Sequence, residues 1–371
     1  MKPVVILDTN ALFGGKPFTR SESAVLLMLS KTKHIRLVIP DVVLHELSRQ
    51  WADSIAENNA KIESAFDGSN KIMGEVRIPD FSIELPTVDR SDLHEAATAM
   101  LVDRGVEIPA FPEVAVVDLL ERDLDRRKPF GKCGKCGKGS TGFRDALIWE
   151  NVRSICDDLA DPAGPVIFVT DNHKDFCAGQ DGELHADLQD ELPSGQRFEV
   201  VKRLNLLLEH EEIKPLADRL HVVSGSLTQQ RVTRLVDRAL TELGGHELET
   251  VGFCAPGDIY DSPIHTKLDD VAFNGVDPDN DTIEFEIFRT GYHDEMTIRV
   301  TVDADCDIEG FIDKSTFLVS GSQFTYYEDW NRHRFRAIEQ HRVRFTLSAD
   351  FTESTVDGVA LTVDEVEEVT P

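Results

Sequence analysis

Four short, largely apolar stretches separated by segments of helical periodicity constrain the fold of this chain most strongly. They cover residues 3–7, 35–39, 166–169 and 198–201. The segments between them carry apolar residues at helical spacing. Short apolar strands that alternate with helices are typical of a parallel sheet with helices on both faces. We therefore expect an α/β fold over the first two hundred or so residues, with right-handed crossovers between the strands.

The pattern of apolar and polar residues changes at about Gly244, and this change predicts a second domain. The chain has 371 residues, too many for one ordinary core. Beyond Gly244, residues 282–288, 296–302 and 343–347 alternate between apolar and polar side chains, a pattern typical of an antiparallel sheet with one wet face. We predict an α/β domain over 1–205 with a helical insert at about 58–127, a helical connector over 206–245, and an acidic β-rich (α+β) domain over 246–371.

The excess of acidic residues disfavours the binding of nucleic acid to most of the protein surface. The formal net charge is −29, and residues 251–371 hold 26 acidic and 9 basic residues. An acidic surface repels nucleic acid at long range. One basic island stands against this trend and is the place where nucleic acid would bind: Arg122, Arg126, Arg127, Lys128, Lys132, Lys135, Lys138 and Arg144.

The sequence gives no sign of a membrane or secretory protein. It contains no run of 18 apolar residues, and its N-terminus lacks the long apolar core of a signal peptide. Its six cysteines are scattered and do not suggest a disulfide framework. We expect a cytoplasmic protein with reduced thiols and no membrane contact.

Four acidic residues occupy similar places at the ends of predicted elements. Asp8 and Asp171 each end an apolar strand, Glu46 lies one turn into a helix, and Asp145 begins a helix after a glycine-rich loop. In open parallel sheets, ligands bind beyond the carboxyl ends of the strands. A single Asp at such a place is usually a helix cap or a turn residue. Four together predict a shared acidic site.

Carboxylates that share one cleft repel each other, and a hard divalent cation relieves that repulsion. Mg²⁺ and Mn²⁺ prefer oxygen ligands and keep bound waters. Two such ions can activate water and stabilise the leaving oxygen during phosphodiester cleavage. The residue types therefore favour a metal-dependent nuclease with Mg²⁺ or Mn²⁺ as its cofactor.

The motifs around these acidic residues resemble those of the PIN domain family. They are Ile-Leu-Asp-Thr-Asn at 6–10, the segment 38–43 that leads to Glu46, Phe-Arg-Asp-Ala at 143–146, and Val-Thr-Asp-Asn at 169–172 followed by Asp-Phe at 175–176. Their order matches the family over about residues 1–205. The segment from Arg127 to Asp145 is similar to a larger bacterial PIN branch (the domain of unknown function numbered 4935).

This resemblance implies a ribonuclease that cleaves single-stranded RNA with a divalent metal. It implies that Asp8, Glu46, Asp145 and Asp171 are the catalytic metal ligands, and that Thr9 or Asn10 orients them. Asp171, Asn172 and Asp175 could each fill the fourth acidic position. We favour Asp171 because it follows the strand directly, and we count Asp175 among the metal-binding residues.

The glycine-rich loop at 131–142 has three interpretations. Its lysines, Lys132, Lys135 and Lys138, together with Arg144 and Asn172, would contact substrate phosphates. Cys133 and Cys136 could instead form half of a zinc site, completed by Cys156, Cys177, His173 or His185. The third interpretation is a solvated loop with no function.

Two other functions compete with an endoribonuclease. Related acid-rich folds cut flaps, which makes a structure-specific DNA nuclease an alternative. The other is a non-catalytic PIN scaffold that acts through its C-terminal domain. The resemblance implies single-stranded RNA as the partner, and a homodimer and a regulatory protein partner stay open.

Overall fold

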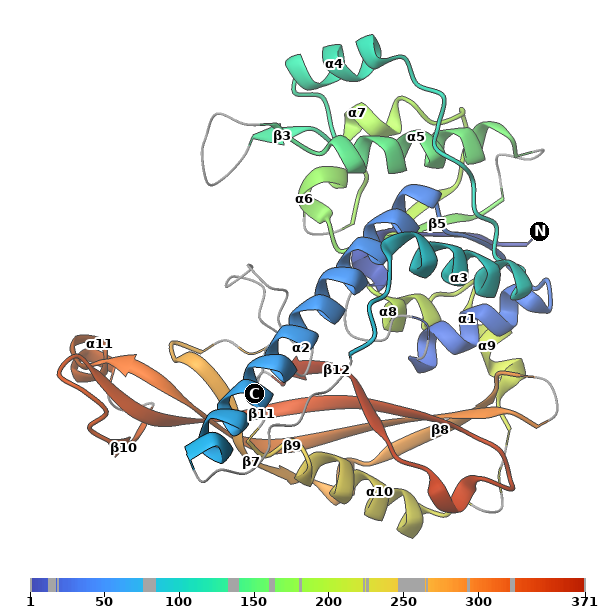
Figure 1. Ribbon diagram of the computed structural model, residues 1–371. Helices are drawn as coiled ribbons and strands as arrows, with labels where there is room; N and C mark the ends of the chain where they lie inside the picture. The colour runs from blue at the N-terminus through green and yellow to red at the C-terminus, as the bar shows by residue number, and fades with distance from the viewer. Residues whose placement is uncertain are drawn as a thin grey trace. The chain divides into compact units, whose positions relative to one another are not determined.

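The computed structural model divides the chain into two compact units (Figure 1). Unit 1 comprises Met1–Phe13 and Leu29–Lys214, and unit 2 comprises Gly14–Met28 and Pro215–Pro371. The structure describes residues 2–12, 18, 20–75, 85–132, 140–159, 164–179, 182–222, 224, 227–245, 264, 266–291, 294–320 and 324–369. In the described part of the chain, no helix has the length and apolar character needed to cross a membrane.

Unit 1 is built on a parallel sheet of four strands, as the sequence predicted. The strands lie in the order β2-β1-β5-β6, and each neighbouring pair is parallel. Every residue of β1 and β5 is buried, which explains their uniformly apolar sequences. The bounds are Val4–Leu7 for β1, Arg36–Val38 for β2, Val166–Val169 for β5 and Phe198–Val201 for β6.

Helices connect these strands, and a small hairpin interrupts the longest connection. The hairpin pairs β3, Gly131–Lys132, with β4, Ser140–Thr141. The helices are the short 3₁₀ segment η1 at Thr9–Leu12, α1 at Ser21–Lys31, α2 at Asp41–Glu75, α3 at Arg90–Asp103, α4 at Val116–Leu124, α5 at Phe143–Asp157, α6 at His173–Phe176, α7 at Ala186–Gln189, α8 at Leu204–Leu208 and α9 at Lys214–Ala217.

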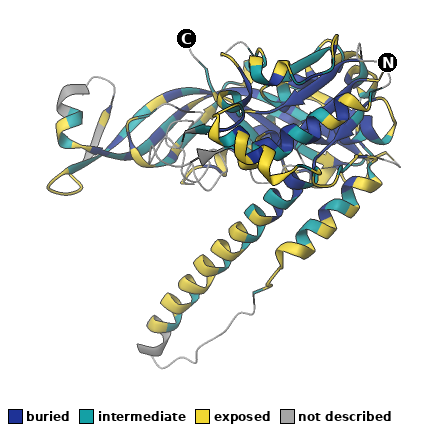
Figure 2. Cartoon of the chain, turned by 90° about the horizontal axis from the view of Figure 1, so that it is seen from above, coloured by how far each residue is buried: buried dark blue, intermediate teal, exposed yellow. Residues whose placement is uncertain are grey.

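The helix α2 continues from the core of unit 1 into the predicted helical insert. It spans 35 residues, and α3 packs against it. Half of its first ten residues are buried, whereas most of those from Asp53 to Ser69 are exposed, as Figure 2 shows. Only the N-terminal part of α2 therefore contributes to the core around the sheet.

The strand order places a ligand-binding position at the carboxyl ends of β1 and β5. The chain leaves β1 toward β2 on one side, and leaves β5 toward β6 on the other. Open α/β sheets bind ligands at such a reversal. Leu7 pairs with Val169, so Asp8 and Thr170, the residues that follow, begin side by side at this edge.

Unit 2 is the predicted β-rich domain, and its sheet is antiparallel. The strands β9 and β11 pair along all eighteen residues of each, from Met296↔Phe351 to Asp313↔Arg334. β10 and β12 pair with β11, whereas β7 and β8 pair with β9. The strands are β7 at Asp269–Pro278, β8 at Glu284–Arg289, β9 at Met296–Asp313, β10 at Thr325–Glu328, β11 at Arg334–Phe351 and β12 at Thr362–Glu368.

One helix supplies much of the core of unit 2. In α10, Gln229–Thr241, the side chains of Val232, Val236 and Leu240 lie one turn apart and are fully buried in the core that also contains Phe273 of β7. The segment 206–245, predicted as a connector, divides between Lys214 and Pro215, and the larger part, from Pro215 onward, belongs to the β-rich unit. The remaining elements are η2 at Asp218–Leu220, η3 at Asn280–Thr282, α11 at Lys314–Ser320 and η4 at Val356–Gly358.

Candidate active site

Asp8 lies buried at the reversal point of the sheet. Its Oδ1 accepts a hydrogen bond from the backbone N–H of Thr9 at 2.6 Å, and its Oδ2 accepts one from the Thr170 hydroxyl at 2.6 Å. Asp8 is 1% exposed. Both hydrogen bonds fix the carboxylate in one orientation, at the edge where β1 and β5 end.

Glu46 is connected to Asp8 through a single residue. The Thr9 hydroxyl donates a hydrogen bond to Glu46 Oε2 at 3.1 Å. The other oxygen, Oε1, forms an ion pair with Arg144 of α5. Of Thr9 and Asn10, the two residues that the family resemblance implies as orienting groups, Thr9 forms this bridge. Arg144, predicted to contact substrate, instead meets Glu46 in this structure.

Asp145 enters the site from the first turn of α5. Gly142 precedes the helix with a φ of +106°, and a Cβ there would lie 2.5 Å from the carbonyl oxygen of Pro129. A glycine is therefore required where the chain turns into α5. Asp145 Oδ1 accepts a hydrogen bond from the side-chain amide of Asn172 at 3.1 Å.

The carboxyl groups of Asp8, Asp145 and Asp175 influence one another through their charges. Burial raises the pKa of Asp8 to about 7, and the charge of Asp145 adds to the rise. Burial also raises the pKa of Asp145, with a further contribution from the charge of Asp175. Asp175 in turn lies 3.8 Å from the Lys128 ammonium. Asp8, Asp145 and Asp175 thus form a chain of mutually repelling carboxylates.

Asp171 lies apart from this chain of interactions. Its Oδ1 is 3.4 Å from the Lys202 ammonium, and its side chain is 41% exposed. Asn172 follows it and bonds both Thr170, through its backbone N–H, and Asp145. The charge of Asp175 acts on the pKa of Asp145, whereas Asp171, which the sequence favoured as the fourth residue, pairs with Lys202. Asn10 is exposed in η1.

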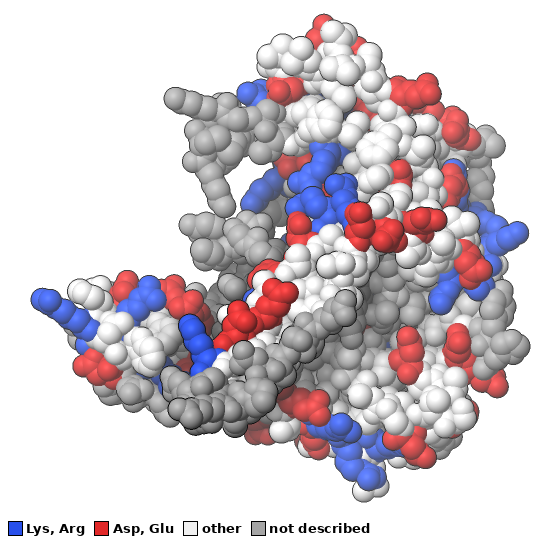
Figure 3. All heavy atoms as spheres, in the orientation of Figure 1, with Lys and Arg blue, Asp and Glu red and all other residues white. Residues whose placement is uncertain are grey.

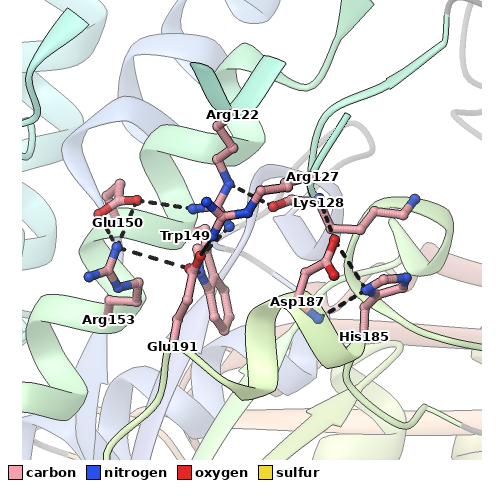
Figure 4. Close-up of polar contacts among 9 residues, drawn as sticks. All are labelled: Arg122, Arg127, Lys128, Trp149, Glu150, Arg153, His185, Asp187 and Glu191. Carbon is pink, nitrogen blue, oxygen red and sulfur yellow. Dashed lines mark hydrogen bonds and ion pairs between the residues drawn. The ribbon is translucent and has the colours of Figure 1, made fainter. Parts of the chain in front are cut away.

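Much of the predicted basic island is engaged within unit 1. Figure 4 shows Arg122 between Glu150 and Glu191, and the Trp149 indole N–H donates to Glu191 at 2.7 Å. The other ion pairs of the described island residues join Arg126 to Asp123, Arg127 to Glu191, Lys128 to Asp175 and Arg144 to Glu46. Their charge is therefore largely balanced by acidic partners in this structure.

On the face drawn in Figure 3, lysine and arginine side chains gather in the part of the view occupied by unit 1, with acidic side chains beside them. The loop residues Cys133, Lys135, Cys136 and Lys138 lie outside the described residues. Of Lys132 the structure describes the backbone in β3. The substrate and zinc interpretations of this loop stay predictions.

A group that sequence reasoning missed lies between α2 and α3. Asp41, His45 and His94 bring one ligand atom each to within 4.8 Å of one another. In the described part of the chain, this is the group of metal-ligating side chains that meets that spacing. Burial lowers the pKa of His45, and His94 contributes. The spacing of Asp41 and His45, one helical turn apart, was visible in the sequence; the approach of His94 was not.

Comparison with known families identifies the N-terminal part of the chain. Residues 5–176 match the family model described as the PIN domain. This range contains β1, β2, β5 and the residues Asp8, Glu46, Asp145, Asp171 and Asp175, and this part of the chain belongs to the PIN domain family. PIN domains are generally metal-dependent nucleases, and the match does not distinguish the branch within the family. No curated protein and no solved structure matches the chain.

Proposed function

We propose that this protein is an endoribonuclease that cleaves phosphodiester bonds of single-stranded RNA with Mg²⁺ or Mn²⁺. The observation that carries the proposal is the buried carboxylate of Asp8, held by two hydrogen bonds at the reversal point of the sheet with Asp145 beside it. A buried carboxylate is expensive to ionise unless a cation compensates it. The site therefore suits a cation.

The donor set fits a hard divalent ion. Asp8, Glu46, Asp145 and Asp175 offer only carboxylate oxygens, the ligands that Mg²⁺ and Mn²⁺ prefer. Asp171 lies at the exposed edge and is the alternative fourth residue. A divalent ion bound there would supply Lewis-acid activation of water and neutralise charge that develops on the phosphate.

The chain's own residues position these groups and meet the substrate. Thr9 and Thr170 fix the orientation of Asp8, and Asn172 fixes Asp145. Arg144 lies at the open side of the site, with its side chain 57% exposed. We expect its guanidinium to exchange Glu46 for a substrate phosphate, which Arg can hold through two hydrogen bonds. The choice of single-stranded RNA rests on the family resemblance.

Parallel digestion of labelled substrates tests this proposal. Purified full-length protein is incubated with one sequence as single-stranded RNA, as single-stranded DNA and as a DNA flap, with Mn²⁺, with Mg²⁺ or with EDTA. We expect internal cleavage of the RNA with either metal and none with EDTA. Asp145→Asn should lower the rate roughly a hundredfold or more, because metal ligation contributes several kcal/mol to such reactions.

Asp67→Asn is the matched control, because Asp67 is exposed on the distal part of α2. It should cleave like the wild type. Cleavage of the DNA flap alone would replace the RNA assignment with a structure-specific DNA nuclease. Failure to cleave any substrate with either metal would favour a non-catalytic scaffold.

A further inference from the structure

Two histidines and one aspartate converge where α3 packs against the first turns of α2. Asp41 and His45 lie one turn apart on α2, and His94 reaches them from α3. His94 Nε2 lies 2.7 Å from Asp41 Oδ1, and His45 Nε2 lies 3.6 Å from Asp41 Oδ2. In both imidazoles Nε2 is the nitrogen that faces Asp41, and the two rings face different oxygens of its carboxylate.

The two imidazole rings are held in place by each other and by a neighbour. Their centroids lie 4.1 Å apart in a stacked arrangement, and Phe111 lies 5.3 Å from the His45 ring. The side chains of Asp41 and His94 are 21% and 22% exposed, and that of His45 is 38% exposed. The cluster is therefore partly shielded and yet open to solvent.

We propose that Asp41, His45 and His94 bind a transition-metal ion, with Zn²⁺ as the best fit, at a site separate from the carboxylates around Asp8. Zn²⁺ binds imidazole nitrogen and carboxylate oxygen, and three protein ligands leave one position for water. Imidazole suits Zn²⁺ and its neighbours in the first transition row, whereas Mg²⁺ prefers an all-oxygen site. The two sites of unit 1 therefore differ in the metal they select.

Other charged groups around the cluster are compatible with this assignment. The Arg90 guanidinium lies 3.5 Å from His45 Nδ1, the ring nitrogen that does not face Asp41. The guanidinium weakens affinity by repulsion but does not occupy a ligand position. Asp41 supplies the negative charge that offsets the ion, and it also begins α2.

The site links the packing of α3 to the position of Glu46. His45 and Glu46 are consecutive in α2, so their side chains project about 100° apart around the helix. One faces α3, and the other faces Thr9 and Arg144. An ion bound by residues of both helices would fix the start of α2, and so the place from which Glu46 reaches the active site.

Zinc binding by untagged, full-length protein tests the proposal. After removal of metal with a chelator and dialysis, the protein is titrated with Zn²⁺ in competition with a chromophoric chelator, in excess Mg²⁺ to fill the carboxylate site. We expect one bound Zn²⁺ per chain. His94→Ala should weaken binding by more than about a hundredfold, because loss of even an outer-sphere partner costs roughly 10–100-fold in metal affinity.

Three variants separate this site from the rest of the molecule. His34→Ala, which removes an exposed histidine of unit 1, should bind Zn²⁺ like the wild type, and so should Asp8→Asn. Asp41→Asn keeps the size of the side chain and should lose Zn²⁺ binding while circular dichroism shows an intact fold. With Co²⁺, the wild type should show visible absorption bands that Asp41→Asn and His94→Ala lack. Equal Zn²⁺ affinity in the wild type and Asp41→Asn would overturn the proposal, whatever the nuclease activity.

Discussion

At the scale of single residues, position in the sheet determines what each carboxyl group does. Asp8 follows a fully buried strand, so it is shielded from water and fixed by two hydrogen bonds. Asp171 lies one residue further from its strand, because Thr170 directly follows β5, and its side chain is 41% exposed and pairs with Lys202. The sequence pattern alone could not separate the two, because which way a side chain turns after a strand depends on the loop that follows.

The first prediction concerns the fourth acidic residue. Asp175→Asn should reduce Mn²⁺ affinity and RNA cleavage more strongly than Asp171→Asn, because Asp175 acts electrostatically on Asp145, whereas Asp171 is paired at the exposed edge. Mn²⁺ binding followed by electron paramagnetic resonance, together with cleavage rates, measures both variants. A larger loss in Asp171→Asn would restore the assignment that the sequence favoured.

A second prediction concerns the partly buried carboxyl group of Asp364 in unit 2. Burial raises its pKa to about 7, and the charge of Glu22 adds to the rise. Between pH 3.8, the ordinary pKa of an aspartate, and about pH 7, Asp364 therefore keeps its proton in the folded state, whereas the unfolded state releases it. The free energy of unfolding should fall as pH rises from about 4 to about 7, by on the order of 1 kcal/mol per pH unit.

Asp364→Asn should remove this part of the pH dependence. Urea unfolding at several pH values measures it, with Glu367→Gln on the exposed side of the same strand as the control. If Asp364→Asn and the wild type lost stability in parallel between pH 4 and 7, the proton would reside elsewhere.

At the scale of elements, short connections place the site residues. The sequence predicted the strands β1, β2, β5 and β6 because their apolar runs leave little alternative. It did not predict β7, whose Asp269–Pro278 segment is rich in polar residues and is strand only because it pairs with β9. It also missed the approach of His94 to α2, since that contact joins residues 53 positions apart.

The turn into α5 yields a third prediction. Gly142→Ala should destabilise unit 1 by more than about 1 kcal/mol, because a left-handed backbone costs alanine roughly that much and its Cβ meets the Pro129 carbonyl. Cleavage should fall as well, since Arg144 and Asp145 begin the helix that follows. Gly179→Ala is the control, because no heavy atom lies within 4 Å of its added Cβ. Equal melting temperatures for the two variants would contradict this interpretation.

The ion pairs that anchor α4 yield a fourth prediction. Arg122 is buried between Glu150 and Glu191, whereas Arg126 pairs with Asp123 at the surface. Arg122→Ala should cost about 3 kcal/mol, because it leaves buried acidic groups with fewer partners. Arg126→Ala should cost less than about 1 kcal/mol. Denaturant unfolding measures both, and similar losses would mean that Arg122 serves a surface role instead.

At the scale of the whole molecule, the two units share the chain in an interleaved order. Gly14–Met28 lies between β1 and β2 in sequence but belongs to unit 2, where Glu22 pairs with Arg299 and the backbone N–H of Ser21 bonds Asp364. The change in the pattern of apolar and polar residues at about Gly244 predicted a second domain. It could not predict this exchange, because the partners lie more than 270 residues further along the chain.

This exchange predicts how a truncated chain behaves. Residues 1–214 without the β-rich part should melt at a lower temperature than the full chain and tend to aggregate. The reason is that Val25 and Leu26, buried residues of α1, belong to unit 2, and the truncation removes the rest of that unit. Exposing each such side chain costs about 1.5–3 kcal/mol. Thermal unfolding and light scattering of the two chains measure the effect, and a truncated chain as stable as the whole would contradict it.

The proposed phosphodiester cleavage depends on a divalent ion held by Asp8 and the acidic residues around it. Cleavage of a single-stranded RNA in the presence of Mn²⁺, by full-length wild type and Asp8→Asn at equal concentration, tests it most directly. We predict metal-dependent cleavage by the wild type and a rate lower by roughly a hundredfold or more in Asp8→Asn. Equal rates in the two proteins would show that the buried carboxylate takes no part in the reaction.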